Sequence, residues 1–401
     1  MNRMRARWLL ALSLLSSAGA ADAVTPAGPA QWLADIGDDT VIDAATAPDG
    51  QLALLLAACD GGQCALEVQR YSADGAAVGG RIAVESLQGD SVPKGYASVA
   101  LDAAGQVVVG VPDRTRGHVV CFAPDGSRTQ HAIRGGYAEG TFVQDLVFVG
   151  DGDFVVGFTQ DAVPERVYHF YAARMRRFDA GTCAPVAAAQ SLERHWEVVG
   201  PTLSSIRDLT LSASPDGRLA VAWVVRNRQG ATNLKLKLFQ ANGTAIGGTK
   251  VVGPIAAGTA GDVGIAADGQ VAVAYHPPGA SAPGKLVVRR YSALGVAAVP
   301  EAFDVAELPG DANAQVGVSA AGDTVAGWTS FPEAADSTVS VRAFDATSQL
   351  LGEPVAVTSG AGHFVLDDVL QRFDGGFTVL YVEFFADALA PRYHVRRFLA
   401  D

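Results

Sequence analysis

A short turn that ends in glycine recurs along the whole chain, and this repeat constrains the fold more than any other feature. Each copy is preceded by a segment of alternating apolar residues and followed by an apolar run such as Val271 to Tyr275. The copies are Pro48-Asp49-Gly50, Ala104-Gly105, Asp151-Gly152, Pro215-Asp216-Gly217, Asp268-Gly269, Ala321-Gly322 and Asp374-Gly375. Asp-Gly between two such runs is a strong signal for a β-hairpin, because the tight turn requires a positive φ angle. The sequence therefore predicts one hairpin repeated seven times.

An aromatic residue forms a second marker in every repeat, and it lies 17 to 26 residues after the turn glycine. The copies are Tyr71, Phe122, Phe178, Phe239, Tyr291, Phe344 and Phe398. A further short strand follows the marker, as in Lys250 to Val252, so each unit contains four antiparallel strands. One such sheet cannot bury both of its faces, whereas seven stacked around an axis can. We therefore expect an all-β fold, a single seven-bladed β-propeller of four-stranded blades. The alternative is a pair of β-sandwiches whose repeats match by chance.

The last repeat is incomplete, because the chain stops at Asp401, three residues after Phe398. The segment from Gln31 to Ile36 precedes the first full unit and has no place in it. We expect this N-terminal segment to supply the missing strand and to close the ring, with Trp32 buried in a core.

The N-terminus has the order of a secretory signal peptide. Arg3, Arg5 and Arg7 come first, an apolar run from Trp8 to Leu15 follows, and small residues continue to Ala23. We expect residues 1–23 to be a signal peptide and residues 24–401 to be the propeller domain. The apolar run is too short to span a bilayer. The protein is therefore expected in the periplasm or outside the cell, without membrane insertion.

The overall charge bears on partners. The formal net charge is −12, and an acidic surface repels phosphate backbones, so nucleic-acid binding is not expected. We expect a monomer that engages a protein or a glycan of the cell envelope or the extracellular space.

Two halves of the repeat resemble those of a known family. Phe373 to Val379 matches Asp-Gly-Gly-Phe-Val-Val, and both Arg177 to Gly181 and Arg342 to Ala346 match Arg-Phe-Asp-Ala-x-Gly. The pattern resembles the propeller-type repeats of large secreted bacterial proteins. The resemblance implies the fold and export, and it brings no catalytic residue. The copies are divergent, since tryptophan occupies the strand position only at Trp223 and Trp328.

One face of the predicted propeller is the better candidate for function. The loops between second and third strands, and the links between units, are long and differ from unit to unit, and variable loops on a repeated scaffold usually carry binding. Aromatic and basic side chains on these loops are typical of recognition surfaces. The candidate binding residues are Arg116, Tyr168, His169 and Tyr171 on loops, Arg194, His195 and Trp196 on a link, and His276. The alternative is that the aromatic residues fill gaps between blades and the charges are solvated.

Aspartate recurs seven residues before the turn glycine, at Asp43, Asp145, Asp262 and Asp368. In unit four the aspartate is Asp208, which lies two residues before the equivalent position. If these side chains point inward, they form a ring of carboxylates at the tunnel mouth that could hold calcium. The alternative is that each carboxylate accepts hydrogen bonds from backbone N–H groups of its own loop.

No nucleophile turn, zinc helix or sialidase box occurs in the sequence, so no catalytic residue is assigned. We expect a binding module. A cation-dependent hydrolase or lyase at the tunnel mouth, and a structural repeat without a ligand, stay open.

The four cysteines suggest two disulfide bonds. Cys59 and Cys64 flank the tip of a predicted hairpin, where neighbours across the strands come within bonding range. Cys121 and Cys183 form the remaining pair, in adjacent units. The alternative for this second pair is two buried, inert thiols.

Overall fold

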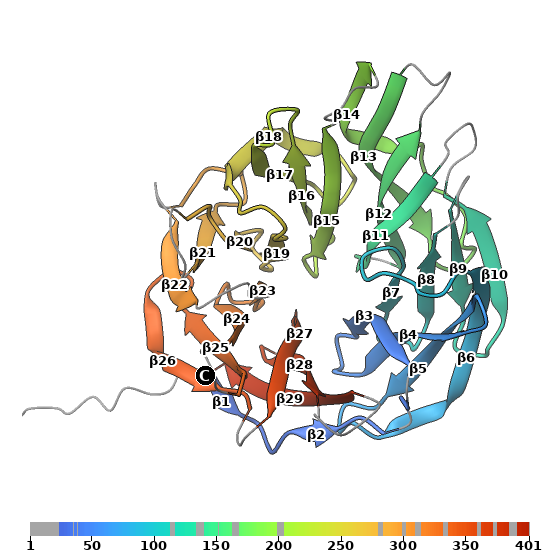
Figure 1. Ribbon diagram of the computed structural model, residues 1–401, viewed down its shortest axis with the longest axis horizontal. Coiled ribbons are helices and arrows are strands. Elements are labelled where there is room, and N and C mark those ends of the chain that lie inside the picture. Colours follow the sequence, from blue (N-terminus) through green and yellow to red (C-terminus); the bar gives the residue numbers. More distant parts are fainter. Residues whose placement is uncertain are drawn as a thin grey trace, which may run out of the picture.

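Seven antiparallel sheets surround a central axis in the computed structural model (Figure 1), which confirms the predicted propeller. The structure describes residues 24–34, 36–37, 39–112, 117–133, 140–150, 152–162, 168–198, 204–279, 284–298, 302–308, 314–331, 336–358, 362–371, 375–384 and 391–400. Within these ranges every regular element is a strand, and no helix is long and apolar enough to cross a membrane. The expected signal peptide lies outside the described residues.

The first strand of each blade lies nearest the axis and the fourth lies at the periphery. Blade 1 contains β3 (Thr40–Thr46), β4 (Leu52–Asp60), β5 (Gln63–Tyr71) and β6 (Ala77–Gln88), and blade 2 contains β7 (Ser98–Leu101), β8 (Val107–Val111), β9 (His118–Phe122) and β10 (Arg128–Ala132). Blade 3 contains β11 (Gly140–Val149), β12 (Asp153–Ala162), β13 (Tyr168–Asp179) and β14 (Gln190–Val198), and blade 4 contains β15 (Ser205–Ala213), β16 (Leu219–Arg226), β17 (Thr232–Phe239) and β18 (Ala245–Pro254). Blade 5 contains β19 (Asp262–Ile265), β20 (Val271–Tyr275), β21 (Gly284–Tyr291) and β22 (Phe303–Leu308), and blade 6 contains β23 (Ala314–Val318), β24 (Thr324–Ser330), β25 (Thr338–Phe344) and β26 (Leu350–Ala356). Blade 7 contains β27 (His363–Gln371), β28 (Phe377–Phe384) and β29 (Arg392–Ala400), completed by β1 (Val24–Pro26) and β2 (Gln31–Trp32).

The repeated turns join the first and second strands as predicted. Gly50 has a φ of 85°, and its N–H donates to the carbonyl of Ala47 at 2.9 Å. The Asp49 carboxylate accepts the N–H of Gln51 at 3.1 Å, which explains why aspartate so often precedes the glycine. The aromatic markers end the third strands, and Phe178, Phe344 and Phe398 are fully buried. The two sequence markers are therefore the turn and the core anchor of each blade.

The N-terminal segment closes the ring, as predicted, but the pairing is made by Val24–Pro26 and Gln31–Trp32 and not by the whole of Gln31 to Ile36. β1 pairs with β29 from Val24 opposite Ala400, and β2 pairs with β29 at Trp32 opposite His394. The expectation that Trp32 is buried is wrong, because its side chain points outward from the peripheral strand and is 60% exposed, beneath the Arg392 guanidinium. The next apolar side chain, Leu33, turns inward and is fully buried among residues of blades 1 and 7.

Leu33 is predicted to carry the stability of the closure and Trp32 is not. Leu33→Ala should lower the free energy of unfolding by about 2–5 kcal/mol, because it leaves a cavity in a packed core. Trp32→Ala should change it by less than about 1 kcal/mol, because an exposed side chain has little burial to lose. Urea denaturation of the two variants measures both values. Equal losses would contradict this account of the closure.

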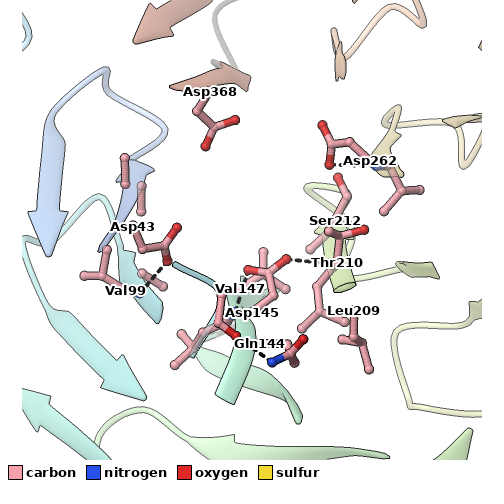
Figure 2. A pocket seen from close by; sticks show the side chains of 18 of the residues that line it. Asp43, Val99, Gln144, Asp145, Val147, Leu209, Thr210, Ser212, Asp262 and Asp368 are labelled. Carbon is pink, nitrogen blue, oxygen red and sulfur yellow. Dashed lines mark hydrogen bonds between the residues drawn. The ribbon is translucent and has the colours of Figure 1, made fainter. Parts of the chain in front are cut away.

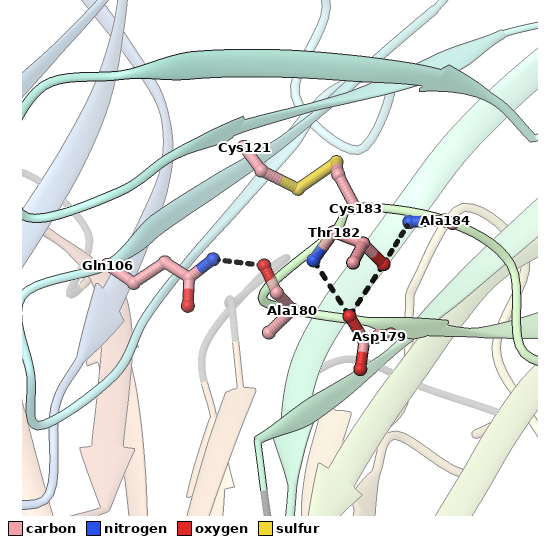
Figure 3. The surroundings of a disulfide bond; sticks show 7 residues. All are labelled: Gln106, Cys121, Asp179, Ala180, Thr182, Cys183 and Ala184. Carbon is pink, nitrogen blue, oxygen red and sulfur yellow. Dashed lines mark hydrogen bonds between the residues drawn. A yellow bond between two sulfur atoms is a disulfide. The ribbon is translucent and has the colours of Figure 1, made fainter.

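Both expected disulfide bonds are present. Cys59 and Cys64 are directly opposite each other on β4 and β5, with their Cα atoms 4.0 Å apart. Cys121 on β9 is bonded to Cys183 in the turn between β13 and β14, which ties blade 2 to blade 3 (Figure 3). The Asp179 carboxylate holds that turn by accepting the N–H of Thr182 at 2.7 Å. Disulfide bonds are typical of proteins from oxidising compartments such as the periplasm or the extracellular space.

The two disulfide bonds should differ in their effect on stability. The Cys121–Cys183 bond spans 62 residues and the Cys59–Cys64 bond spans 5. Replacing the first pair by alanine should lower the free energy of unfolding by about 4 kcal/mol, and replacing the second by roughly half as much, because a longer closed loop restricts the unfolded chain more. Chemical denaturation of the two double variants tests the order. A larger loss for the short loop would refute it.

Candidate functional site

One continuous cavity of about 1190 Å³ runs along the axis of the ring, and the innermost strands of all seven blades contribute to its lining. On the face that carries the variable loops, the lining extends to the second and third strands of blade 3 and to the link before β7. The candidate site is therefore a tunnel that widens beside blade 3.

Four recurring aspartates surround this space. Figure 2 shows the side chains of Asp43, Asp145, Asp262 and Asp368 pointing into the cavity from blades 1, 3, 5 and 7. In blades 1, 3 and 7 the aspartate directly follows a β-bulge in the innermost strand. A bulge re-aims the side chains beside it, which explains how an inner strand turns a carboxylate toward the axis.

The carboxylates fasten neighbouring blades together. Asp43 accepts the N–H of Val99 in blade 2 at 2.8 Å, and Asp262 accepts the N–H of Val316 in blade 6 at 2.7 Å. Asp145 accepts the N–H of Leu211 in blade 4 at 2.5 Å. These contacts support the hypothesis that the carboxylates bind backbone N–H donors. The three donors named here belong, however, to the next blade and not to the aspartate's own loop.

Asp368 differs from the other three. One of its oxygens accepts the N–H of Val369 at 2.7 Å, and among the described residues its second oxygen has no hydrogen-bond partner. This carboxylate therefore has an oxygen that faces the cavity and is open to a ligand.

Burial makes these carboxylates weaker acids than usual. It raises the pKa of Asp43 and that of Asp262 to about 6. The pKa values of Asp145 and Asp368 are raised well above the ordinary value, first by burial and then by the charges of neighbouring carboxylates. The four groups therefore repel one another across a shared space.

The calcium hypothesis finds no support in the described part of the chain. No three His, Cys, Asp or Glu side chains there come together in a way that could hold a metal ion. Calcium takes about six to eight oxygen ligands, and three of the four carboxylates direct an oxygen at backbone N–H donors of the next blade instead.

Blade 3 supplies the side wall of the cavity. The prediction that Tyr168 to Tyr171 lie on a loop and Arg194 to Trp196 on a link is wrong, because β13 and β14 continue through both segments. Tyr171 lies opposite His195 and Phe170 opposite Trp196, so successive residues point to opposite faces of the blade. The Tyr171 and His195 rings stack 5.4 Å apart, whereas Trp196 contacts Phe170 on the other face and is 61% exposed.

His169 and Tyr171 line the cavity together with Asp161, which lies on β12. The His169 side chain is buried, and its Nε2 atom contacts the Asp161 carboxylate. Burial raises the pKa of Tyr171 to about 12, so its phenol keeps its proton at neutral pH. The three side chains therefore bring an imidazole, a carboxylate and a phenol to one wall.

Two carboxylates hold blade 3 against blade 4 next to this wall. Glu193 binds the Lys235 ammonium at 2.7 Å and the indole N–H of Trp223 at 3.2 Å. Burial acts to raise the pKa of Glu197, but hydrogen bonds from Ser204 and the Arg228 guanidinium outweigh it and lower that pKa to about 2. Hydrogen bonds and ion pairs between blades 3 and 4 therefore support this wall.

Gln160 is the lining residue that sequence reasoning missed. It is 1% exposed, and neither its amide nitrogen nor its amide oxygen has a partner among the described residues. The Nδ1 atom of His169 is likewise without a partner in the described ranges. The signal was available, because Gln160 is a polar residue near the end of the otherwise apolar run from Phe154 to Phe158.

The link between β6 and β7 lies at the rim of the cavity. Lys94 forms an ion pair with Asp367 of blade 7. On the opposite side, the ring of Tyr96 packs edge-on against Phe142 of blade 3 with 4.8 Å between ring centroids. The link therefore contacts two blades that are not neighbours and narrows the opening.

Arg194 and His276 are not among the residues that line the cavity. Arg116 and the side chain of Tyr168 fall outside the described residues. Arg194 is exposed on the peripheral strand β14. His276 is buried, and its Nδ1 atom lies 3.0 Å from the carbonyl oxygen of Lys285, so it does not belong to an exposed surface.

Comparison with known proteins shows the fold. A polysaccharide lyase of family PL25, an ulvan lyase, has a TM-score of 0.60 at 10% identity over 92% of this chain and 96% of its own. The same enzyme bound to -[GlcA(1-4)Rha3S]- has a TM-score of 0.59 at 10% identity, again over 92% and 96% of the two chains. The polysaccharide lyase Uly1 has a TM-score of 0.55 at 11% identity over 87% of this chain and 88% of its own. No family model and no curated protein matches the sequence. The chain thus has the architecture of a single large propeller.

The tunnel carboxylates should give the protein a distinctive pH dependence. A carboxyl group whose pKa is raised by folding stabilises the native state below its ordinary pKa, and this contribution is lost as the pH rises through its folded value. For Asp43, raised from 3.8 to about 6, the loss amounts to about 2 kcal/mol between pH 4 and pH 7.5. Asp43→Asn should therefore be less stable than the wild type at pH 4 and should gain relative to it by up to this amount at pH 7.5.

Denaturant titrations at the two pH values measure this difference. Asp304→Asn is the matched control, because this mostly exposed carboxylate lies on the peripheral strand β22 outside the cavity. A constant difference between Asp43→Asn and the wild type at both pH values would contradict the prediction.

Proposed function

We propose that this protein binds a glycan in the cavity beside blade 3. The observation that carries the proposal is the buried, unpartnered amide of Gln160 in the lining of a large cavity. A buried polar group without a partner lowers stability by about 1–3 kcal/mol, so its presence in a cavity wall indicates that a ligand or water satisfies it.

The shape of the site favours a glycan over a protein partner. Ligand pockets are concave and combine apolar walls with a few placed polar groups. Here the Tyr96–Phe142 pair supplies an aromatic surface at the rim, and Gln160, His169 and Asp161 supply donors and acceptors within. A protein partner would favour an exposed surface, and of the predicted residues whose side chains the structure describes only Arg194 and Trp196 offer one.

The comparisons add support of a different kind. The three similar structures named above are of polysaccharide lyases, and one of them has been solved with -[GlcA(1-4)Rha3S]-. The signal-like N-terminus and the two disulfide bonds suit a monomeric protein of the periplasm or the cell exterior, where envelope and extracellular glycans are found.

Catalysis on the bound glycan is the second candidate function. The observation in its favour is that His169, Asp161 and Tyr171 meet in the cavity, with the His169 and Tyr171 ring centroids 5.2 Å apart. Imidazole and phenol groups within reach of a substrate are typical proton-transfer groups. Incubation with a polysaccharide panel tests it. Turnover that requires calcium would instead favour the lyase or hydrolase built on Asp43, Asp145, Asp262 and Asp368.

Gln160→Leu separates binding from stability. Leucine has a similar size and needs no hydrogen bond, so the variant should be as stable as the wild type or more stable by about 1 kcal/mol. Its affinity for the glycan should fall by about tenfold or more, because a polar contact of the ligand is lost. A glycan array followed by calorimetry on the oligosaccharide that binds measures the affinity.

Gln69→Leu is the matched control for this test. Gln69 is also buried, lies outside the cavity, and donates to the carbonyl of Arg70 at 2.9 Å. Its substitution should lower stability and leave glycan binding unchanged. If Gln160→Leu instead loses stability and keeps full affinity, Gln160 is a structural residue and the proposal loses its main support.

A further inference from the structure

The charge of the cavity is strongly one-sided. Among the described residues that line it, eight are aspartates and only one lysine and one arginine oppose them. The aspartates are Asp43, Asp102, Asp145, Asp161, Asp208, Asp262, Asp367 and Asp368. Both cations are already engaged by carboxylates, Lys94 by Asp367 and Arg207 by Asp208 at 2.6 Å. When its carboxylates are ionised, the lining therefore carries excess negative charge that its own cations leave unbalanced.

This charge is concentrated on half-buried carboxylates inside the ring. Asp145 and Asp368 repel other carboxylates of the ring, and burial adds to the free-energy cost of ionising them. A clefted surface of one sign attracts ligands of the opposite sign and repels ligands of the same sign. An anionic polymer would add like charge to this space, whereas a cation would relieve the repulsion.

The arrangement of the carboxylates fits several separate cationic groups better than one metal ion. They stand on different blades around the tunnel, and in the described ranges no three ligating side chains come together to hold a metal. An ammonium group needs only a few oxygen acceptors, because it offers three N–H donors. The partner-free oxygen of Asp368 provides one such acceptor.

We propose that the ligand of this cavity is a glycan bearing protonated amino groups, a hexosamine polymer with free amines, with its ammonium groups directed at the axial carboxylates. The proposal rests on the proposed function and specifies the class of glycan. In this arrangement the Tyr96–Phe142 pair contacts the apolar face of a sugar ring at the rim, and the Gln160 amide hydrogen-bonds to a hydroxyl group within the cavity. Uronate-rich and sulfated glycans are excluded by their charge.

Calorimetry with three hexamers tests the proposal, using glucosamine, N-acetylglucosamine and galacturonate at pH 6 and at low and high salt. The glucosamine hexamer should bind at least about tenfold more tightly than the N-acetylated one, and the galacturonate hexamer most weakly. Binding should also release protons, measured in two buffers of different ionisation enthalpy, because an ammonium group favours the ionised form of the carboxylates beside it.

Asp368→Asn is the informative variant. The asparagine carbonyl can keep the hydrogen bond to Val369, so the fold should survive, and the melting temperature checks this. Affinity for the glucosamine hexamer should fall about tenfold, while affinity for the N-acetylated hexamer stays the same. Asp304→Asn, which removes the same charge from the exterior, should bind all hexamers like the wild type.

Four outcomes would overturn the inference. Galacturonate binding as tight as glucosamine binding, or equal binding of all three hexamers, refutes the charge argument while the proposed glycan function stands. Equal losses in Asp368→Asn and Asp304→Asn show that a cationic sugar merely collects on an acidic surface. If the protein binds neither the three hexamers nor any other glycan on an array, the proposed function itself is refuted.

Discussion

The pairing of β1 and β2 with β29 is the interaction on which the rest of the structure depends. A four-stranded blade buries its faces only against its neighbours, so an open ring would expose the edge of β29 and one face of blade 7. The segment that closes the ring also contributes Leu33 and Ile36 to the core between blades 7 and 1. Because the two ends of the chain are joined in one sheet, every other blade is held between two partners, and the axial cavity acquires a fixed shape.

A second set of interactions stabilises the ring at its axis, namely the hydrogen bonds between aspartates on one inner strand and the backbone of the next. Each bridging carboxylate accepts a backbone N–H of the next blade, and this structural role explains why a carboxylate recurs at this position. These aspartates also destabilise the fold when they are ionised, because burial and mutual repulsion both disfavour the charged carboxylates. A ring of amides or hydroxyls could accept the same N–H groups, as Ser212 does for Ile265 at 3.2 Å and Thr329 does for Leu366 at 2.7 Å. Charge on the axis is therefore more than the packing requires.

The fold could be predicted from the sequence because its signals are local and repeated, whereas the site could not. Turn glycines such as Gly50 and anchors such as Phe178 act within their own blade, so seven copies reinforce one another. Side-chain direction is decided by neighbours that the sequence does not place beside a residue. Trp32 was expected in a core, but a peripheral strand has only one covered face, and Leu33 occupies it.

In blade 3, too, the sequence does not predict which side chains point toward the site. Its strands run further than the repeat suggests, so Arg194, His195 and Trp196 alternate between two faces and do not form one patch. Register shifts after Val143 and after Ala173 change which residues face the cavity, and such bulges leave no clear mark in the sequence. His169 and Tyr171 of the predicted set line the cavity, and so does Gln160, which that set does not include.

Three polar groups in the cavity wall have no hydrogen-bond partner among the described residues, and this lowers the stability of the fold. Gln160, the Nδ1 atom of His169 and the outer oxygen of Asp368 are polar groups that the described protein atoms leave unsatisfied, and all three line the same cavity. Some buried polar groups outside the cavity are satisfied, as with Gln69 in blade 1 and the Glu193 and Glu197 networks behind the cavity wall, whereas others, such as Thr324 and Thr378, have a hydroxyl oxygen without a partner among the described residues. A sequence maintained for stability alone would lose such groups readily, because apolar replacements of similar size stabilise the fold. What distinguishes Gln160, His169 and Asp368 is that they share one concave cavity, and this is the observation on which the proposed polar ligand rests.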